Sequence, residues 1–373
     1  MMVPLTRTDT SVLGRWWWTV DRWSLFLLCA LTGIGLVLTG AASPAVAERL
    51  NLPPTHFLLR QALFVVPAMG VLFLVSMLNA RQVRRLAVLV FLASICLLLL
   101  TLAVGTEIKG ARRWITLGGL SLQVSEFVKP AFAVTAAWMF AARRLGEDIP
   151  GNAISAGLLF VVVGLLLAQP DVGQTVVVTI VWFSQFFLAG LPMVLVALLL
   201  ILGLGGLVTA YFVFPHVASR VDRFFNPQAG DSYQIDRALE AFKNGGLFGT
   251  GPGLGTAKSS LPDAHADFVF AVAGEEFGLI ACLLLVLLFA AIVLRGFSRV
   301  LQDNDLFIVL ATTGLLVQFS LQALINMASS VNLMPPKGMT LPFISYGGSS
   351  ILAIAFGMGM MLALTRRRPG DSR

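Results

Sequence analysis

Long apolar runs alternate with short polar segments along almost the whole chain. Each run approaches the length of about twenty residues that an α-helix needs to cross a bilayer. The ten runs cover residues 24–42, 57–78, 86–105, 127–142, 153–168, 174–189, 192–214, 268–294, 306–328 and 345–365. The pattern predicts an all-α polytopic membrane protein of about ten transmembrane helices, with a long outer loop over 215–267 between the seventh and eighth.

Composition leaves no room for a separate soluble domain. Of the 373 residues, 57% are hydrophobic and only 12% are charged, about half the charged fraction of a soluble domain. We therefore expect residues 1–373 to form one integral membrane domain. The net charge of +7 has no soluble basic face to carry it, so a nucleic-acid partner is not expected. Cys29, Cys96 and Cys282 lie inside apolar runs without CxxC spacing, which disfavours disulfides and metal sites.

Arginine clusters beside the spans predict the orientation, because short cytoplasmic segments carry an excess of positive charge. With a cytoplasmic N-terminal tail at 1–23, the inner segments contain Arg7, Arg15, Arg22, Arg81, Arg84, Arg85, Arg143, Arg144, Arg295, Arg299, Arg366, Arg367, Arg368 and Arg373. An even number of spans returns the tail at 366–373 to the same side. Both termini are therefore predicted to be cytoplasmic.

Basic residues on the outer side run against that charge distribution and need another explanation. They are Lys109, Arg112 and Arg113, with Lys129 just inside the fourth span, and Arg220, Arg223, Arg237, Lys243 and Lys258 in the long loop. One hypothesis is that they bind an anionic group such as a phosphate. The alternative is that they pair with nearby acids, namely Glu107, Glu126, Asp222 and Asp236.

The long outer loop contains two recognisable patterns. Ile235, Leu239 and Phe242 have the spacing of an amphipathic helix that lies flat at the membrane surface. Glycines then dominate from Gly245 to Gly255, but their spacing matches neither of the common nucleotide-binding motifs. We expect a mobile or tightly turning loop there instead of a nucleotide site.

Asp267 stands where this loop meets the eighth span, two residues after His265. A carboxylate at such a boundary is partly desolvated, which suits it to accept a proton from a hydroxyl group. Aspartate is also a common helix N-cap, and its position alone favours that role.

Glu275 and Glu276 lie about two turns deeper in the same span. Charges at that depth are costly and usually face a partner or a polar cavity. Lys129 is the predicted partner, so these residues could form a structural ion pair or line a substrate cavity. A proton relay for transport is a third hypothesis, although no chain of acids runs through successive spans.

The last outer loop, 332–350, contains three prolines and the adjacent Gly347 and Gly348, which break helical structure. Irregular backbone at membrane depth is tolerated only where it is buried in protein or lines a wet cavity. Lys337 and Ser345 could present polar groups to such a cavity. No GxSxG signature accompanies the serines, so hydrolase chemistry is not expected.

Three segments together resemble the SEDS family (shape, elongation, division and sporulation proteins). They are KGARRWITLGGLSLQVSEFVKP at 109–130, LPDAHADFVFAVAGEEFG at 261–278 and KGMTLPFISYGGSS at 337–350. The resemblance extends over all ten spans. The Lys337–Gly338 pair ahead of TLPFISYGG is similar to the cell-division branch of the family, whereas elongation members usually differ before that glycine.

The resemblance implies a peptidoglycan glycosyltransferase that polymerises lipid II, an undecaprenyl-diphosphate-linked disaccharide-pentapeptide, at the outer face of the cytoplasmic membrane during septal wall synthesis. It implies that Asp267, in the sequence His265-Ala266-Asp267-Phe268, is the catalytic carboxylate. Family members commonly have threonine where Ala266 stands. The residues expected at the substrate are Lys109, Arg112, Arg113, Glu126, Lys129, Arg220, Arg223, His265, Glu275, Glu276, Lys337, Ser345, Gly347 and Gly348.

The resemblance also implies partners: a class B penicillin-binding transpeptidase with one membrane anchor, and other membrane proteins of the division machinery. The sequence specifies no cofactor, and a divalent cation (Mg²⁺ or Mn²⁺) on the diphosphate is left open. Three alternatives remain at this point: a lipid II flippase, a scaffold without chemistry, and an elongation-type polymerase.

Overall fold

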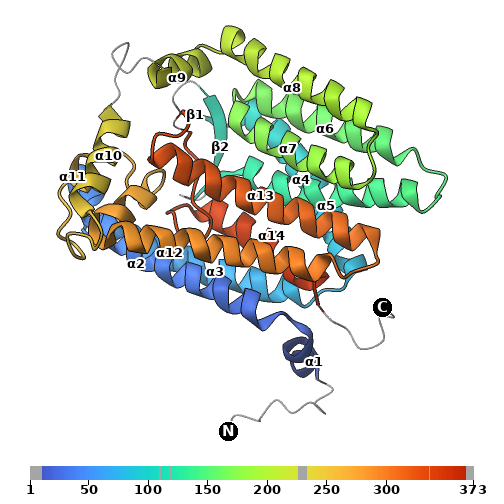
Figure 1. The fold of residues 1–373 in the computed structure, drawn as a ribbon, viewed down its shortest axis with the longest axis horizontal. Coiled ribbons are helices and arrows are strands. Elements are labelled where there is room, and N and C mark those ends of the chain that lie inside the picture. The colour runs from blue at the N-terminus through green and yellow to red at the C-terminus, as the bar shows by residue number, and fades with distance from the viewer. Residues whose placement is uncertain (1–10, 109–110, 118–119, 226–232, 336, 367–373) are drawn as a thin grey trace.

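The structure, a computed structural model, describes residues 11–108, 111–117, 120–225, 233–335 and 337–366 (Figure 1). Ten helices form the bundle: α2 (Arg22–Arg49), α3 (His56–Ser76), α4 (Ala80–Val104), α5 (Val124–Arg144), α6 (Gly151–Ala168), α7 (Val172–Leu188), α8 (Met193–Val213), α12 (Val269–Val300), α13 (Leu306–Ser330) and α14 (Gly348–Leu364). They match the ten apolar runs one to one. Within the described residues, seven helices are long and apolar enough to cross a membrane, and α7 and α14 are shorter apolar helices. The prediction of a multi-pass helical membrane protein is confirmed.

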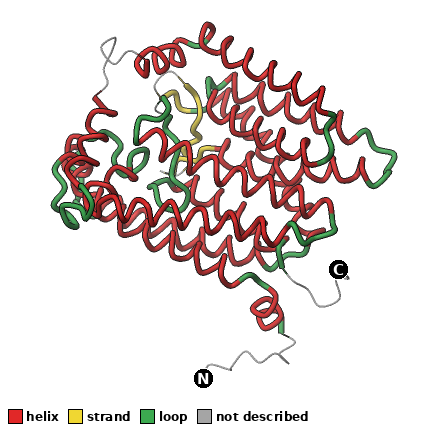
Figure 2. Tube along the Cα trace, in the orientation of Figure 1, coloured by secondary structure: helices red, strands yellow, loops and turns green. Residues whose placement is uncertain are grey.

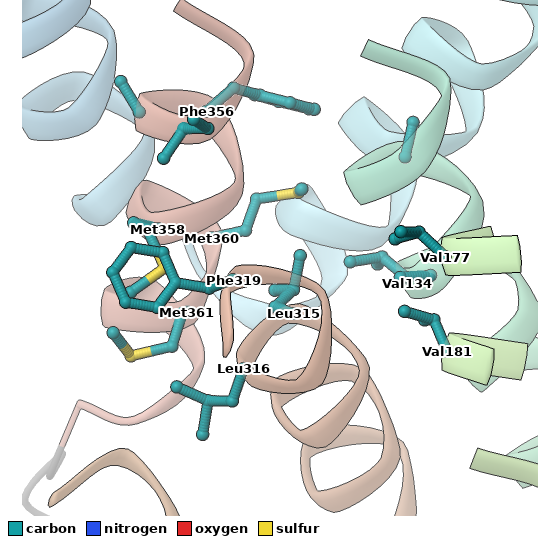
Figure 3. Close-up of a cluster of buried hydrophobic side chains, with 14 of the residues drawn as sticks. Val134, Val177, Val181, Leu315, Leu316, Phe319, Phe356, Met358, Met360 and Met361 are labelled. Atoms are coloured by element: carbon teal, nitrogen blue, oxygen red, sulfur yellow. The ribbon is translucent and has the colours of Figure 1, made fainter. Parts of the chain in front are cut away.

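The centre of the bundle is an apolar core shared by α5, α7, α13 and α14. Val134, Val177, Leu315 and Phe356 come from these four helices and are all buried (Figure 3). α5 and α14 are covered on nearly every side, whereas the other helices expose apolar side chains, and α8 buries only Ala210. Because lipid solvates the outer face, the core needs to fill only the inner one.

Charged residues tie the helix ends together where the chain begins and ends. The short helix α1 (Val12–Thr19) and the end of α14 lie at this end of the bundle (Figure 1). Asp21 is buried and accepts hydrogen bonds from Arg295 at 2.8 Å and from Arg299 at 3.0 Å. Arg366 donates to Thr19 Oγ1 at 2.9 Å. These contacts place both ends of the described chain on one side of the bundle.

A small antiparallel sheet lies at the opposite end, where the sequence analysis expected no strands. It consists of β1 (Thr106–Ile108), β2 (Ala111–Leu117) and β3 (Leu120–Gln123), in that order. The sequence contains the signal for it, since Gly110 and the Gly118–Gly119 pair separate short β-prone runs. The all-α prediction therefore holds for the spans but is wrong for this connection.

The long loop contains three helices, α9 (Pro215–Phe225), α10 (Tyr233–Gly245) and α11 (Ala257–Ser260). Helices α10 and α11 pack onto α12, whereas α9 packs onto α8. Figure 2 shows that loops and strands gather at this end of the molecule. The predicted amphipathic helix is α10, and its buried residues Ile235, Ala238 and Ala241 face α12 and the adjoining apolar cluster. Its apolar face is thus covered by protein.

The glycine-rich segment is a tight loop seated on a kink in α12. Gly278 interrupts the helix with φ 80°, and Gly249 and Gly251 also have positive φ, at 84° and 107°. A β-carbon on Gly278 would lie 2.4 Å from the backbone of Gly249. Only glycine permits this approach, so the kink and the loop depend on each other.

Gly35 on α2 lets that helix touch the backbone of the 337–347 loop. An added β-carbon would lie 2.3 Å from Phe343 O, while at Gly33 it would meet nothing within 4 Å. Alanine normally stabilises a helix by about 1 kcal/mol relative to glycine. We therefore expect Gly35→Ala to lower the apparent Tm in detergent and Gly33→Ala to keep or raise it. Equal Tm values for the two variants would contradict the contact.

Candidate functional site

A cavity of about 570 Å³ opens at the end of the bundle that carries the sheet and the long loop. Its walls come from α3, the sheet, α5, α7, α9, the segment before α12 and the loop before α14. Seven of the predicted site residues line it: Arg113, Glu126, Arg220, His265, Asp267, Gly347 and Gly348. Segments far apart in the sequence therefore meet here, as the three family-like motifs predicted.

The backbone around Asp267 is fixed by the loop before α14. Tyr346 N donates to His265 O at 2.9 Å, and Ser345 Oγ donates to Ala266 O. Asn326 on α13 donates through Nδ2 to Asp267 O at 2.9 Å and to Met339 O at 2.6 Å. Every residue from 265 to 267 is thus held by a hydrogen bond from another element.

The Asp267 side chain lines the cavity and does not cap α12. The N-cap residue is Phe268, and no side-chain cap hydrogen bond is made there, so the capping hypothesis is wrong. Gly338 lies against the carboxylate, since an added β-carbon would be 2.9 Å from Asp267 Oδ2. The absence of a side chain at this glycine leaves the carboxylate room beside the loop.

His265 is packed among aromatic rings next to Asp267. Its ring lies 4.2 Å from that of Phe57 and 5.1 Å from that of Tyr346, centroid to centroid. Burial lowers the pKa of His265 to about 4, which keeps the imidazole neutral at physiological pH. A neutral ring wedged between aromatic groups supports the wall of the cavity and adds no positive charge to it.

Glu126 lies in a buried hydrogen-bond network that forms part of the cavity wall. Its Oε1 accepts from Gln174 Nε2 at 2.7 Å and from Lys129 Nζ at 3.0 Å, and its Oε2 accepts from Ser350 Oγ at 3.2 Å. Lys129 also donates to Gln322 Oε1 at 3.3 Å. Lys129 is buried and does not line the cavity, whereas Glu126 does. Of these two residues expected at the substrate, only Glu126 therefore reaches the cavity.

Three arginines give the cavity a basic wall: Arg60 from α3, Arg113 from β2 and Arg220 from α9. Arg113 donates to the carbonyl oxygens of Gln169, at 3.0 Å, and Pro170. Because these acceptors are neutral, its charge is not cancelled by a salt bridge there. The hypothesis of an anion-binding cluster is consistent with these positions.

The other predicted basic residues have different surroundings. Arg112 is exposed and pairs with Glu107 at 3.6 Å, as the pairing alternative proposed. Lys109 and the side chain of Arg223 lie outside the described residues. Lys337 donates to Asp171 Oδ1 at 2.9 Å. Burial alone would raise the pKa of Asp171, but the positive charges of Lys337 and Arg113 bring it below its ordinary value.

The predicted partnership of Lys129 with Glu275 and Glu276 is wrong. Glu275 accepts three backbone N–H bonds from residues 256–258, at 2.7 to 2.9 Å, and Glu276 pairs with Lys258. Both acids thus anchor the end of the glycine-rich loop to α12. Their side chains lie apart from the cavity, because the loop returns to α12 and occupies that side of the helix.

Several residues of the site were not identified from the sequence. They are Arg60, Asp171, Gln174, Asn326 and Tyr346. Arg60 had a visible signal, because a charge four residues into an apolar run is unusual. Asn326 had a weaker one, as an amide near the end of the ninth run. Their partners depend on how the helices are rotated, which periodicity does not reveal.

No three histidine, cysteine, aspartate or glutamate side chains gather into one metal-binding group within the described parts of the chain. The Mg²⁺ or Mn²⁺ considered from the sequence stays a prediction, in which the diphosphate oxygens themselves would hold the ion.

The lowered pKa of His265 predicts a pH effect on stability. Its folded pKa of about 4 lies below the ordinary 6.5, so the folded state disfavours the charged ring. Stability should be complete above pH 6.5 and fall as the pH drops towards 4, by up to about 3 kcal/mol. His265→Phe keeps the aromatic packing and should lose less apparent Tm between pH 6.5 and 4.5. An unchanged Tm–pH slope in this variant would contradict the assignment.

Comparison with known proteins gives relatives that match nearly the whole chain. The chain is 47% identical to "Probable peptidoglycan glycosyltransferase FtsW" of Caulobacter vibrioides, over 98% of this chain and 94% of that protein. It is 36% identical to the FtsW of Coxiella burnetii that carries the same name, over 93% and 96% of the two chains.

Solved structures agree with these relatives. A chain from "Structural coordination of polymerization and crosslinking by a peptidoglycan synthase complex" matches with a TM-score of 0.77 and 30% identity, covering 93% of this chain and 97% of that one. The rod shape determining protein RodA of Thermus thermophilus matches with a TM-score of 0.67 and 30% identity, over 94% and 97%. The family model described as "Cell cycle protein", named for FtsW, RodA and SpoVE, matches residues 22–369. The chain therefore belongs to this family of cell cycle proteins.

Proposed function

We propose that this protein is a septal peptidoglycan glycosyltransferase that polymerises lipid II, with Asp267 as its general base. The observation that carries the proposal is the cavity that joins Asp267 to three arginines, Arg60, Arg113 and Arg220. Its volume of about 570 Å³ lies in the usual range for small-molecule sites. The names of the relatives support the class of reaction.

The reaction needs one base and one concentration of positive charge. The 4-hydroxyl of a terminal N-acetylglucosamine attacks the anomeric carbon of an N-acetylmuramic acid and forms the new glycosidic bond. Asp267 takes the hydroxyl proton. The bond to the lipid diphosphate breaks, and the diphosphate leaves with the electron pair, stabilised by the arginines. A single displacement inverts the α-linkage to β.

The lipid II flippase is the weaker hypothesis for this structure. It relied on Lys129, Glu275 and Glu276 as a connected set of charges. Glu275 and Glu276 instead hold the glycine-rich loop, while Lys129 pairs with Glu126. The charges are engaged in separate local pairs, which favours a role in shaping the site.

We place the protein in the bacterial inner membrane at the division septum, with both termini in the cytoplasm and the cavity on the outer face. The arginine clusters at the end opposite the cavity support this orientation. A class B penicillin-binding transpeptidase is the proposed partner, together with other division proteins. The similarity to a chain of a peptidoglycan synthase complex supports that pairing.

Asp267→Asn tests the proposed base. It should reduce lipid II polymerisation by the transpeptidase-bound protein by at least about a hundredfold, because the amide accepts no proton. The apparent Tm and the binding of lipid II should stay unchanged. Asp263→Asn is the matched control, because this exposed residue of the same loop does not line the cavity. Full polymer yield from folded Asp267→Asn protein would refute the proposal.

A second measurement separates polymerisation from transport. Proteoliposomes with their cavity face outward receive lipid II only in the outer leaflet, and glycan chains are separated by gel electrophoresis. A polymerase should make chains without moving substrate across the bilayer. If polymer formed only when lipid II was supplied on the inner side, the transporter alternative would gain support over this proposal.

A further inference from the structure

One short turn, residues 169–173, holds two of the basic residues near the cavity. It joins α6 to α7. Arg113 donates to the carbonyl oxygens of Gln169 and Pro170, and Lys337 Nζ donates to Asp171 Oδ1 at 2.9 Å. Two cations from distant parts of the sequence, strand β2 and the loop before α14, therefore depend on the same five residues.

These cations would repel each other without a counter-ion. Asp171 is only 3% exposed, and it is the carboxylate that both of them face. Burial lowers the pKa of Lys337, and Arg220 and Arg113 add to this lowering, so the three positive charges are close enough to interact. One buried carboxylate thus lies against two of these three cations, Lys337 and Arg113.

Gly173 leaves the space that the side chain of Lys337 occupies. A β-carbon at this position would lie 1.7 Å from Lys337 Nζ and 1.8 Å from its Cε. The lysine stem therefore crosses the first turn of α7 at a point where any side chain would displace it. Gly173 lies within the α-helix and not among the glycines of positive φ, so helix geometry does not require glycine here.

The pair stands at the rim of the cavity. Pro170, which precedes Asp171, and Gly338, which follows Lys337, both line it. Arg113 and Arg220 line it as well. The lysine held by Asp171 is therefore next to the arginines that face the proposed leaving group.

We propose that the 169–173 turn is a positioning element for the diphosphate of the lipid-linked donor. Asp171 and Gly173 fix Lys337, while the two carbonyl groups fix Arg113, so that these cations meet one diphosphate in spite of their repulsion. This inference rests on the proposed glycosyltransferase function. Asp171 is a positioning residue, because it acts through Lys337 and does not touch the reacting sugar.

Gly173→Ala tests the inference, since it keeps the charge of Asp171 but pushes the flexible end of Lys337 away. In the transpeptidase-bound protein, we expect the KM for lipid II to rise about tenfold, as for loss of one charge-assisted contact, with kcat much less affected. Inhibition by inorganic diphosphate should weaken in parallel. The apparent Tm should change little, because the gain in helix propensity from alanine offsets part of the weakened Lys337–Asp171 pair. Gly164→Ala in α6, where a β-carbon meets nothing within 4 Å, is the matched control.

A double-variant comparison adds a second readout. Asp171→Asn preserves the N-cap of α7, because asparagine caps as well as aspartate, and should also raise the KM. Added to Lys337→Met, it should have much less than its full effect, since most of its action passes through the lysine and only a smaller part through Arg113.

Two results would overturn the inference: a wild-type KM for Gly173→Ala, or a full additional loss from Asp171→Asn when Lys337 is already absent. Failure of the wild-type protein to polymerise lipid II would instead refute the proposed function. The two failures are therefore distinguishable.

Discussion

The site depends on two buried non-helical segments that satisfy each other's hydrogen bonds. Backbone groups inside a membrane protein have no water to bond, and each unpaired one costs several kcal/mol. Here the segment before α12 and the loop before α14 bond directly, and Asn326 bridges them by donating to Asp267 O and Met339 O. This mutual pairing makes a helix-free region possible among packed helices, and that region contains Asp267.

Buried charged side chains, like buried backbone groups, need a partner. Lys129 pairs with Glu126, Lys258 with Glu276, and Lys337 with Asp171. Each pair joins a helix to another element or braces a helix turn near the cavity. The cost of desolvating both charges offsets much of their attraction, whereas removing one partner would leave an uncompensated buried charge. Such pairs therefore specify a geometry more than they add stability. They hold the walls in place while Arg113 bonds to neutral carbonyl groups.

The sequence predicted the helices well because hydrophobic burial in lipid determines them locally. All ten runs became helices, and the three motifs converged on one cavity, as the family resemblance implied. Pairing was harder to predict. Lys129 and Glu276 both found other partners, because the choice depends on helix rotation and on the loop that Gly278 admits beside α12. Asp171 was missed for a similar reason: its lysine comes from a segment 166 residues away.

The three arginines of the cavity are not supported equally by the core. Arg60 stands on α3, which packs along α14, and Arg113 is bonded to the turn before α7. Arg220 is carried by α9, which packs chiefly on α8, and of the residues of α8 only Ala210 is buried. Few buried contacts mean a low local stability. The position of Arg220 is thus set by how α8 lies in the lipid, whereas the charges at Arg113 and Lys337 are set by the protein core. A diphosphate bound between them would join the most rigid wall of the cavity to the least rigid one.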